Sequence, residues 1–375
     1  MPLLKPFRAL RYDPGRAGPL DELVSPPHDV MTPELRERLL AASSWNAVRL
    51  VRPETVADAA RDLAAWRSKG ILVRDDDPAL WILEETFTAP DSVERTRRGL
   101  VARVRLEPYS EGGVLPHERT FEASTRARLE LLRTTRAKLS PILLLHAGEG
   151  PSPPVGEPDL EATLDGTTSR LWRLDEPGVV ETVTAGARRP LVIADGHHRY
   201  EAARRYHEEE GTDETSHVLA VLVSRDDSGL VVFPTHRVAA EEPVLNGGFR
   251  ETEVPGGAIE GLERLAALPR DRAAFVVLRA GGAFLAEGDP TGDPVADLDA
   301  TAVDRVTRGP VEFTPDAADA EAAVVRGTAA AAFLVRPPTV DQIEAVALAG
   351  ETMPQKSTYF FPKLLAGLVF SPFDE

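Results

Sequence analysis

The stretch LVIADGHHRYE, residues 191–201, passes from an apolar run through a polar turn into residues that favour a helix. Residues 191–193 predict a buried strand, and Gly196 permits a tight turn directly after it. Residues 200–206 are good helix formers. The pattern therefore predicts a strand whose carboxyl end leads into the N-terminus of a helix.

That junction is suited to an anion. Free N–H groups and the helix dipole favour negative charge at a helix N-terminus, and glycine lets the backbone approach it closely. The candidate phosphate-binding residues here are Gly196, His197, His198 and Arg199. Arg199 is the strongest of them because its planar guanidinium matches a phosphate in a bidentate way.

The rest of the chain alternates between helices and strands without a repeat. We expect helices at 33–42, 55–69 and 124–137, and strands at 79–87, 99–107, 141–146, 170–174, 190–194, 217–224 and 230–234. The region from 241 on is rich in Ala, Gly and Pro, and predicts a hairpin (273–279 with 283–286), a strand at 331–335 and a helix opened by a capping box at Thr339 and Gln342. We therefore expect a mixed α/β fold, with a core over 1–240 and a smaller α/β region over 241–375.

Four further motifs place polar side chains in loops or at strand ends: SPPHDV (25–30), EGGVLPHERT (111–120), FPTHRV (233–238) and GETMPQKSTYFFPK (350–363). Prolines and glycines stiffen or bend the backbone beside these side chains. A purely structural role, as a cap, a surface ion pair or an edge histidine, is the alternative for the first three. The candidate substrate-binding residues are His28, Asp29, His117, Arg119, Thr120, His236 and Arg237, and the last motif adds Lys356, Ser357 and Lys363 as phosphate-binding candidates.

ADGHHRYEAA (194–203) resembles the signature of an uncharacterised bacterial family, domain-of-unknown-function family 1015. The resemblance runs through KPFRALRYDP (5–14), SPPHDV, GGVLPHERT, AKLSPILLL (137–145), FPTHRV and AGETMPQKSTYFFPK. PHE (116–118) and DGHHR (195–199) also resemble motifs of the ParB/sulfiredoxin-like superfamily, which includes free-serine kinases. That second resemblance implies a ParB/sulfiredoxin-like core with Glu118 as general base. This chain departs from the kinases in the longer stretch between Glu118 and Asp195, which requires an insertion.

Phosphoryl transfer fits these residues, because the reaction needs cations or N–H groups on the phosphate oxygens and a group that aligns the acceptor hydroxyl. Glu118, Asp195 and His198 are the catalytic candidates, and Asp195 is also the candidate ligand of Mg²⁺. We expect a kinase that uses ATP, ADP or pyrophosphate and acts on serine or a similar metabolite. Two alternatives stay open: a ParB-like nucleotide-binding regulator without turnover, and a metal-dependent phosphohydrolase with ligands among Asp195, His197, His198, His236, His28 and Asp29.

The composition of the chain limits the classes of partner that we expect it to bind. The net charge of -17 over 375 residues disfavours nucleic acid and anionic membranes. The chain has no cysteine, which excludes disulfides and the cysteine chemistry of sulfiredoxin. The N-terminus lacks the apolar region of a signal peptide, so we expect a cytoplasmic protein. The oligomeric state stays open, with a homodimer as one possibility.

Overall fold

The computed structural model describes residues 3–186, 189–245 and 248–373. The chain forms two compact units that are not consecutive in sequence. The first contains residues up to Leu115, then Thr120–Leu230, and then the chain from Pro362 on; the second contains Pro116–Arg119 and Val231–Phe361. The sequence-based boundary between domains, at residue 240, stays a prediction.

In the described part of the first unit, nine strands form one mixed sheet. Its spatial order is β6 (Val114–Leu115), β11 (Leu191–Asp195), β8 (Ile142–His146), β12 (His217–Ser224), β5 (Glu94–Arg105), β4 (Leu80–Thr88), β10 (Thr167–Leu174) and β9 (Leu160–Leu164), with β1 (Leu4–Lys5) also paired to β5. The pairs β6–β11 and β8–β12 are parallel, and the other pairs are antiparallel. Because β11 runs opposite to β8, the carboxyl end of β11 lies beside the amino end of β8.

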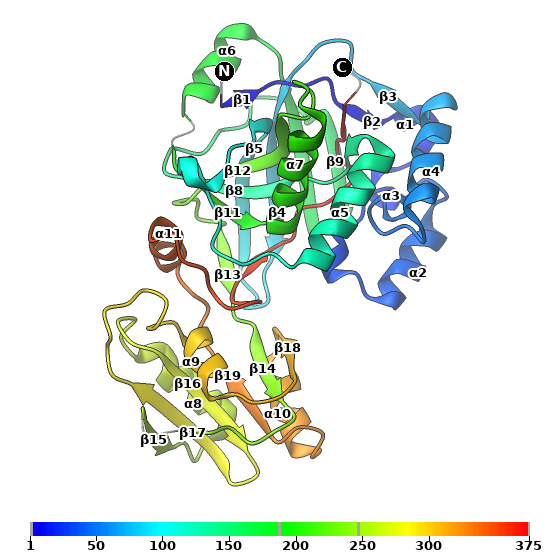
Figure 1. The fold of residues 1–375 in the computed structure, drawn as a ribbon. Coiled ribbons are helices and arrows are strands. Elements are labelled where there is room, and N and C mark those ends of the chain that lie inside the picture. Colours follow the sequence, from blue (N-terminus) through cyan, green and yellow to red (C-terminus); the bar gives the residue numbers. More distant parts are fainter. Residues whose placement is uncertain (1–2, 187–188, 246–247, 374–375) are drawn as a thin grey trace. The chain divides into compact units, whose positions relative to one another are not determined.

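Helices and small ladders complete this unit (Figure 1). They are α1 (Pro14–Ala17), α2 (Pro33–Ala42), α3 (Val48–Val51), α4 (Val56–Ser68), α5 (Glu122–Thr135), α6 (Pro177–Gly186), α7 (His197–Glu210), the 3-10 turns η1 (Leu20–Glu22), η2 (His28–Val30) and η3 (Tyr109–Glu111), and the pairs β2 (Leu10–Tyr12) with β3 (Leu72–Arg74) and β7 (Ala137–Lys138) with β21 (Ser371–Pro372). Tyr200 and Ala203 of α7 pack on the apolar face of the sheet, in one cluster with Ile142, Leu191 and Ile193. This packing fixes α7 over the strand that precedes it.

The C-terminal segment belongs to the first unit because two buried arginines of β5 hold it. Arg97 Nη2 donates to the carbonyl of Pro362 at 2.8 Å, and Arg103 donates to Ser371 Oγ at 2.8 Å and to the carbonyl of Pro372 at 2.7 Å. Arg97 also forms a buried ion pair with Glu85 at 2.6 Å. These bonds satisfy charges that burial alone would make costly. They also place Lys363, the residue after Pro362, in the first unit.

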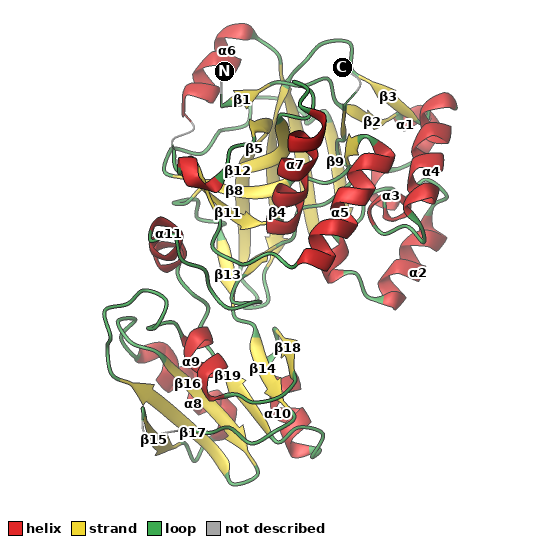
Figure 2. Ribbon diagram, viewed as in Figure 1, coloured by secondary structure: helices red, strands yellow, loops and turns green. Residues whose placement is uncertain are grey.

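The second unit contains, in its described residues, a six-stranded antiparallel sheet. Its order is β15 (Phe249–Glu253), β17 (Gly282–Gly288), β16 (Ala274–Arg279), β19 (Ala331–Leu334), β14 (His236–Ala239) and β18 (Val311–Thr314). Three helices accompany this sheet: α8 (Gly257–Ala267), α9 (Asp299–Val306) and α10 (Ala317–Val325) (Figure 2). Residues of α8 and α10 pack in one apolar cluster with the sheet, and those of α9 in another. The unit also contains α11 (Val340–Leu348) and the pair β13 (Val231–Phe233) with β20 (Tyr359–Phe361).

The mixed α/β prediction is confirmed, as is the capping box of Thr339 and Gln342. The motif helix begins earlier than predicted, at His197, because Gly196 itself is its N-cap. His236 and Arg237 lie at a strand end, as predicted: they are the first two residues of β14, which pairs with both β18 and β19. In the described ranges, the helices are too short or too polar to cross a lipid bilayer.

Candidate phosphate-binding site

The site is built on the turn from β11 into α7. Gly196 adopts a positive φ of 95°, which side chains other than glycine rarely tolerate. A Cβ at this position would also lie 2.6 Å from Cγ2 of Ile142, so the turn needs glycine for space as well as conformation. In the described structure no side chain caps the first turn of α7. The N-terminus of a 14-residue helix is therefore available to an anion.

Asp195, the last residue of β11, lies between two cations. Its Oδ2 accepts from Arg199 Nη2 at 2.6 Å, and its Oδ1 accepts from Lys363 Nζ. Lys363 Nζ also lies 3.7 Å from Oδ2 of Asp29. Burial opposes ionisation of Asp195, but Lys363 and Arg199 outweigh that effect and lower its pKa. Burial likewise opposes the charge on Lys363, yet Asp195 and Asp29 raise its pKa, so both groups are charged at neutral pH.

Arg199 bridges this turn to the amino end of β8. Its Nη1 donates to the carbonyl of Pro141 and lies 3.3 Å from Ser140 Oγ. Both terminal nitrogens of the guanidinium therefore have protein partners. Arg199 contributes positive charge to the site, but its fork is not open for the bidentate phosphate contact that the sequence suggests.

Two more cations surround His28. Burial, together with the charges of Arg128, Arg199 and Arg52, lowers the pKa of His28 to about 3, and Asp195 opposes this change only in part. Burial also lowers the pKa of Arg128 to about 10, helped by Arg199 and Arg52. No carboxylate in the described ranges forms an ion pair with Arg128, whose side chain donates to the carbonyl of Val51 at 3.3 Å. The site thus has a surplus of positive charge in a partly desolvated place.

A small cavity lies beside these cations, with a volume of about 50 Å³. His28, Arg128, Ser140 and Arg199 line its polar side. Its apolar side comes from the helices and strands of the first unit: Val51, Leu131, Leu132, Ala137, Leu139, Ala203 and Val218. This volume is well below that of typical small-molecule pockets.

The two histidines of the motif have different surroundings. His197 is only 5% exposed. His198 Nε2 accepts the backbone N–H of Phe121 at 2.9 Å, and the two rings stack at 5.9 Å. His198 therefore ties α7 to the residue just before α5. This bond occupies one ring nitrogen of His198. The role of His198 as a catalytic residue stays a prediction.

The PHER residues, 116–119, belong to the second unit, where they contact the last predicted motif. His117 is fully buried, its Nε2 lies 3.1 Å from Thr358 Oγ1, and its carbonyl accepts the N–H of Met353. Arg119 Nε donates to Thr352 Oγ1 at 3.0 Å. Two motifs more than 230 residues apart in sequence thus meet. Glu118 forms a bridge with Met353 and is half-buried. Thr120, the residue after Arg119, is part of the first unit.

The remaining candidates lie in the second unit. Lys356 is exposed, whereas Ser357 is buried and donates to the carbonyl of Pro354 at 2.6 Å. His236 is buried and its Nδ1 accepts the N–H of Val335, with burial and then Arg237 lowering its pKa to about 4. Arg237 is buried as well, and its guanidinium lies 5.7 Å from the ring of Phe313. Lys363 is thus the only one of the three predicted lysine and serine ligands that the structure puts beside Asp195.

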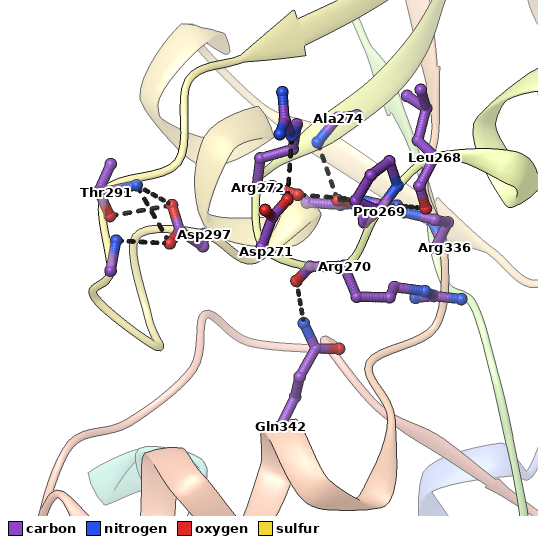
Figure 3. A network of polar contacts seen from close by, with 12 residues as sticks. Leu268, Pro269, Arg270, Asp271, Arg272, Ala274, Thr291, Asp297, Arg336 and Gln342 are labelled. Atoms are coloured by element: carbon purple, nitrogen blue, oxygen red, sulfur yellow. Dashed lines mark hydrogen bonds and ion pairs between the residues drawn. The ribbon is translucent and has the colours of Figure 1, made fainter.

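A separate ion pair in the second unit is structural. Arg336 pairs with Asp299 at 2.7 Å and donates to the carbonyls of Leu268, Pro269 and Arg272 (Figure 3). Gln342 of α11 reaches the carbonyl of Arg270 at 3.3 Å in the same network (Figure 3). Because its hydrogen-bonding groups are used within the protein, this pair stabilises the unit rather than presenting a site.

The side chains of the first unit do not fit Mg²⁺ well. Both carboxylate oxygens of Asp195 already accept from cations, and nowhere in residues 3–186, 189–245 and 248–373 do three His, Asp or Glu side chains gather as a metal would require. The phosphohydrolase alternative therefore lacks a ligand cluster among the described residues.

Sequence reasoning missed Arg128, Arg52 and Ser140. Ser140 belongs to the AKLSPILLL motif, so that motif offered a signal for it. Arg128 lies among several arginines of one helix, and only the packing of α5 distinguishes it from exposed neighbours such as Arg126.

Comparison with known proteins identifies one matching family. Residues 4–301 match the family described as "Protein of unknown function (DUF1015)". No curated protein matches the chain. Among solved structures, a "Free serine kinase in complex with AMP" is 17% identical, with a TM-score of 0.40, over 69% of this chain and 86% of that one. SbnI from Staphylococcus aureus, with a C-terminal truncation, is 13% identical (TM-score 0.37, 72% and 87% covered), and a conserved hypothetical protein from Pyrococcus furiosus is 15% identical (0.38, 70% and 92%).

Proposed function

The chain belongs to the DUF1015 family, and we propose that it is a small-molecule phosphotransferase, which moves a phosphoryl group from ATP, ADP or pyrophosphate to the hydroxyl of serine or a similar metabolite. The observation that carries this proposal is the surplus of positive charge at the N-terminus of α7. Among the described residues, four cations gather there, Arg52, Arg128, Arg199 and Lys363, beside two carboxylates, Asp29 and Asp195. An anionic ligand is the natural complement of such a cluster.

In this proposal, the first-turn amides of α7 and the side chain of Lys363 hold the phosphate donor, with Arg199 adding charge. Asp195 orients Lys363 and Arg199. The acceptor hydroxyl gives its proton to Glu118 while its oxygen attacks phosphorus, and the bond from phosphorus to the bridging oxygen of the donor breaks. That bridging oxygen keeps the bonding electrons, so the leaving group departs as an anion. The base role of Glu118 rests on the resemblance of the PHE motif.

The test replaces Glu118 by glutamine. Gln keeps the size and hydrogen bonding of the side chain but does not accept a proton. We expect Glu118→Gln to lower single-turnover transfer to serine roughly a hundredfold while calorimetric affinity for the donor stays close to that of the wild type. Glu111→Gln, at an exposed position of the same motif, is the matched control and should leave both unchanged.

The outcomes separate the function classes. Wild-type turnover in Glu118→Gln would make the PHE motif structural and move the base role to Asp195 or Asp29. Nucleotide binding without transfer to any hydroxyl compound would favour a ParB-like regulator. Tightly bound metal after purification would favour the phosphohydrolase.

A further inference from the structure

We propose that the small cavity beside Arg128 binds the acceptor of the proposed reaction and restricts it to serine: Arg128 holds the carboxylate, and His28 and Ser140 accept from the ammonium group. The identification of this ligand as the acceptor rests on the proposed function. The claim that serine binds here rests on the cavity itself, whose lining residues all belong to the first unit.

Arg128 supplies the group that binds a carboxylate. A guanidinium has five N–H donors, and that of Arg128 bonds to the carbonyl of Val51 at 3.3 Å through one nitrogen. The other two cations of the lining are engaged: both terminal nitrogens of Arg199 have partners, and Lys138 donates to a backbone carbonyl at 3.0 Å. In this lining, Arg128 therefore has the spare donors for a bidentate contact with a carboxylate.

His28 and Ser140 supply acceptors for an ammonium group. The pKa of His28, about 3, keeps its imidazole neutral at pH 7, so one of the ring nitrogens accepts hydrogen bonds. Ser140 Oγ accepts from Arg199 Nη1 at 3.3 Å and has a second lone pair. A zwitterion adds no net charge, and its carboxylate neutralises Arg128, one of the cations that act on His28. The two ends of an α-amino acid thus find different partners in one cavity.

The volume of the cavity limits the ligand to the smallest metabolites. About 50 Å³ has room for roughly three to five water molecules. Serine has few enough non-hydrogen atoms to take their place, whereas an aromatic or long side chain does not fit. Leu131, Ala203 and Val218 are buried and form part of the apolar wall, so the additional methyl group of threonine would meet packed side chains. We therefore expect the cavity to distinguish serine from threonine.

Calorimetry of the full chain without any phosphate donor tests the claim with ligands that change one group of serine at a time. Ethanolamine lacks the carboxylate, 3-hydroxypropanoate lacks the ammonium group, and threonine adds a methyl group. We expect serine to bind about tenfold more tightly than each of them, or better. Affinity for any of the three that equals that for serine would overturn the corresponding part of the proposal.

Variants of the lining connect this affinity to the cavity. Arg128→Met should weaken serine binding at least tenfold, and Arg128→Lys should restore part of it. Arg126→Met, at an exposed position of the same helix, is the control and should bind serine as the wild type does. Val218→Ala removes two methyl groups from the wall and should bring the affinity for threonine closer to that for serine.

No binding of serine, or binding that Arg128→Met leaves unchanged, would overturn the proposal. Displacement of serine by pyrophosphate would assign the cavity to the phosphate donor and would overturn it as well. If Arg128→Met fails to fold, Ala203→Leu, which fills the cavity from α7, should abolish serine binding in its place. Serine that binds in the cavity but is never phosphorylated would refute the proposed function and leave the binding claim standing, whereas transfer to serine that does not depend on Arg128 would do the reverse.

Discussion

Lys363 offers the sharpest test of the site, because it lies 168 residues from Asp195 in sequence and yet bonds to it. Lys363→Met keeps most of the apolar stem and removes the charge. A pair of unit charges about 4 Å apart is worth about 4 kcal/mol at an effective dielectric constant of about 20. Burial of Lys363 and the surviving Arg199–Asp195 pair at 2.6 Å offset part of this. We expect the free energy of unfolding to fall by about 2–3 kcal/mol.

A double-mutant cycle isolates the pair. Asp195→Asn alone should cost a similar amount, since it removes the carboxylate that Lys363 contacts most closely and leaves Asp29 at 3.7 Å. The double variant should lose less than the sum of the two, with a coupling of about 2 kcal/mol. Additive losses would show that the pair does not form. Lys356→Met, at an exposed lysine, is the control and should stay within about 0.5 kcal/mol of the wild type.

Tryptophan fluorescence during urea unfolding is the assay, because all four tryptophans, Trp45, Trp66, Trp81 and Trp172, lie in the first unit.

The two pKa shifts fix how the stability that the Asp195–Lys363 pair contributes depends on pH. Asp195, with its pKa lowered, contributes stability above its ordinary pKa of about 4, and Lys363, with its pKa raised, contributes below its ordinary pKa of about 10.4. The coupling should therefore be constant from pH 5 to pH 9, as unfolding curves at several pH values would show.

Three further predictions follow from other parts of the structure. Burial lowers the pKa of His217 and of His236 to about 4, so each histidine stabilises the fold above pH 6.5, and this stabilisation is lost as the pH falls. Each should lower the free energy of unfolding by about 2 kcal/mol between pH 7 and pH 5. His217→Gln should make the free energy of unfolding depend less on pH in that range, as unfolding curves would show. Arg97→Met should cost about 3–5 kcal/mol because it strands the buried Glu85, whereas Arg95→Met, which breaks a surface pair, should cost less than about 1 kcal/mol in the same urea assay. The net charge of -17 predicts no salt-sensitive binding to random duplex DNA, and micromolar binding that weakens steeply with salt in a fluorescence anisotropy titration would contradict this.

Local sequence was enough to predict the turn at the centre of the site. The apolar run 191–193, Gly196 and the helix formers after it depend on neighbours within a few residues, and the structure has β11, a left-handed Gly196 and α7 there. The capping box at Thr339 is local in the same way. The start of α7 was misplaced by three residues, because the pattern does not show that Gly196 caps the helix through its backbone conformation.

Contacts between residues far apart in the sequence were not predictable from the sequence alone. Within its motif, Lys363 looks like Lys356, but the buried Arg97 binds the carbonyl of Pro362 and so delivers Lys363 to Asp195. From the sequence, the guanidinium of Arg199 is expected to be open to a phosphate, but packing brings the Pro141 carbonyl and the Ser140 hydroxyl to it. Arg128 is one of four arginines between residues 126 and 136, and only the placement of α5 beside α7 turns it toward the cavity.

The sequence by itself therefore determined the chemistry that is available: a glycine turn at a helix N-terminus, the charged groups around it, and the absence of cysteine. These follow from residue identity and from short-range backbone preferences. The tertiary structure alone decided which charges neutralise one another and which are left over. That outcome depends on burial and on distances between residues as far apart in sequence as Asp29 and Lys363. A charge becomes a binding group only where packing removes its water without supplying a partner.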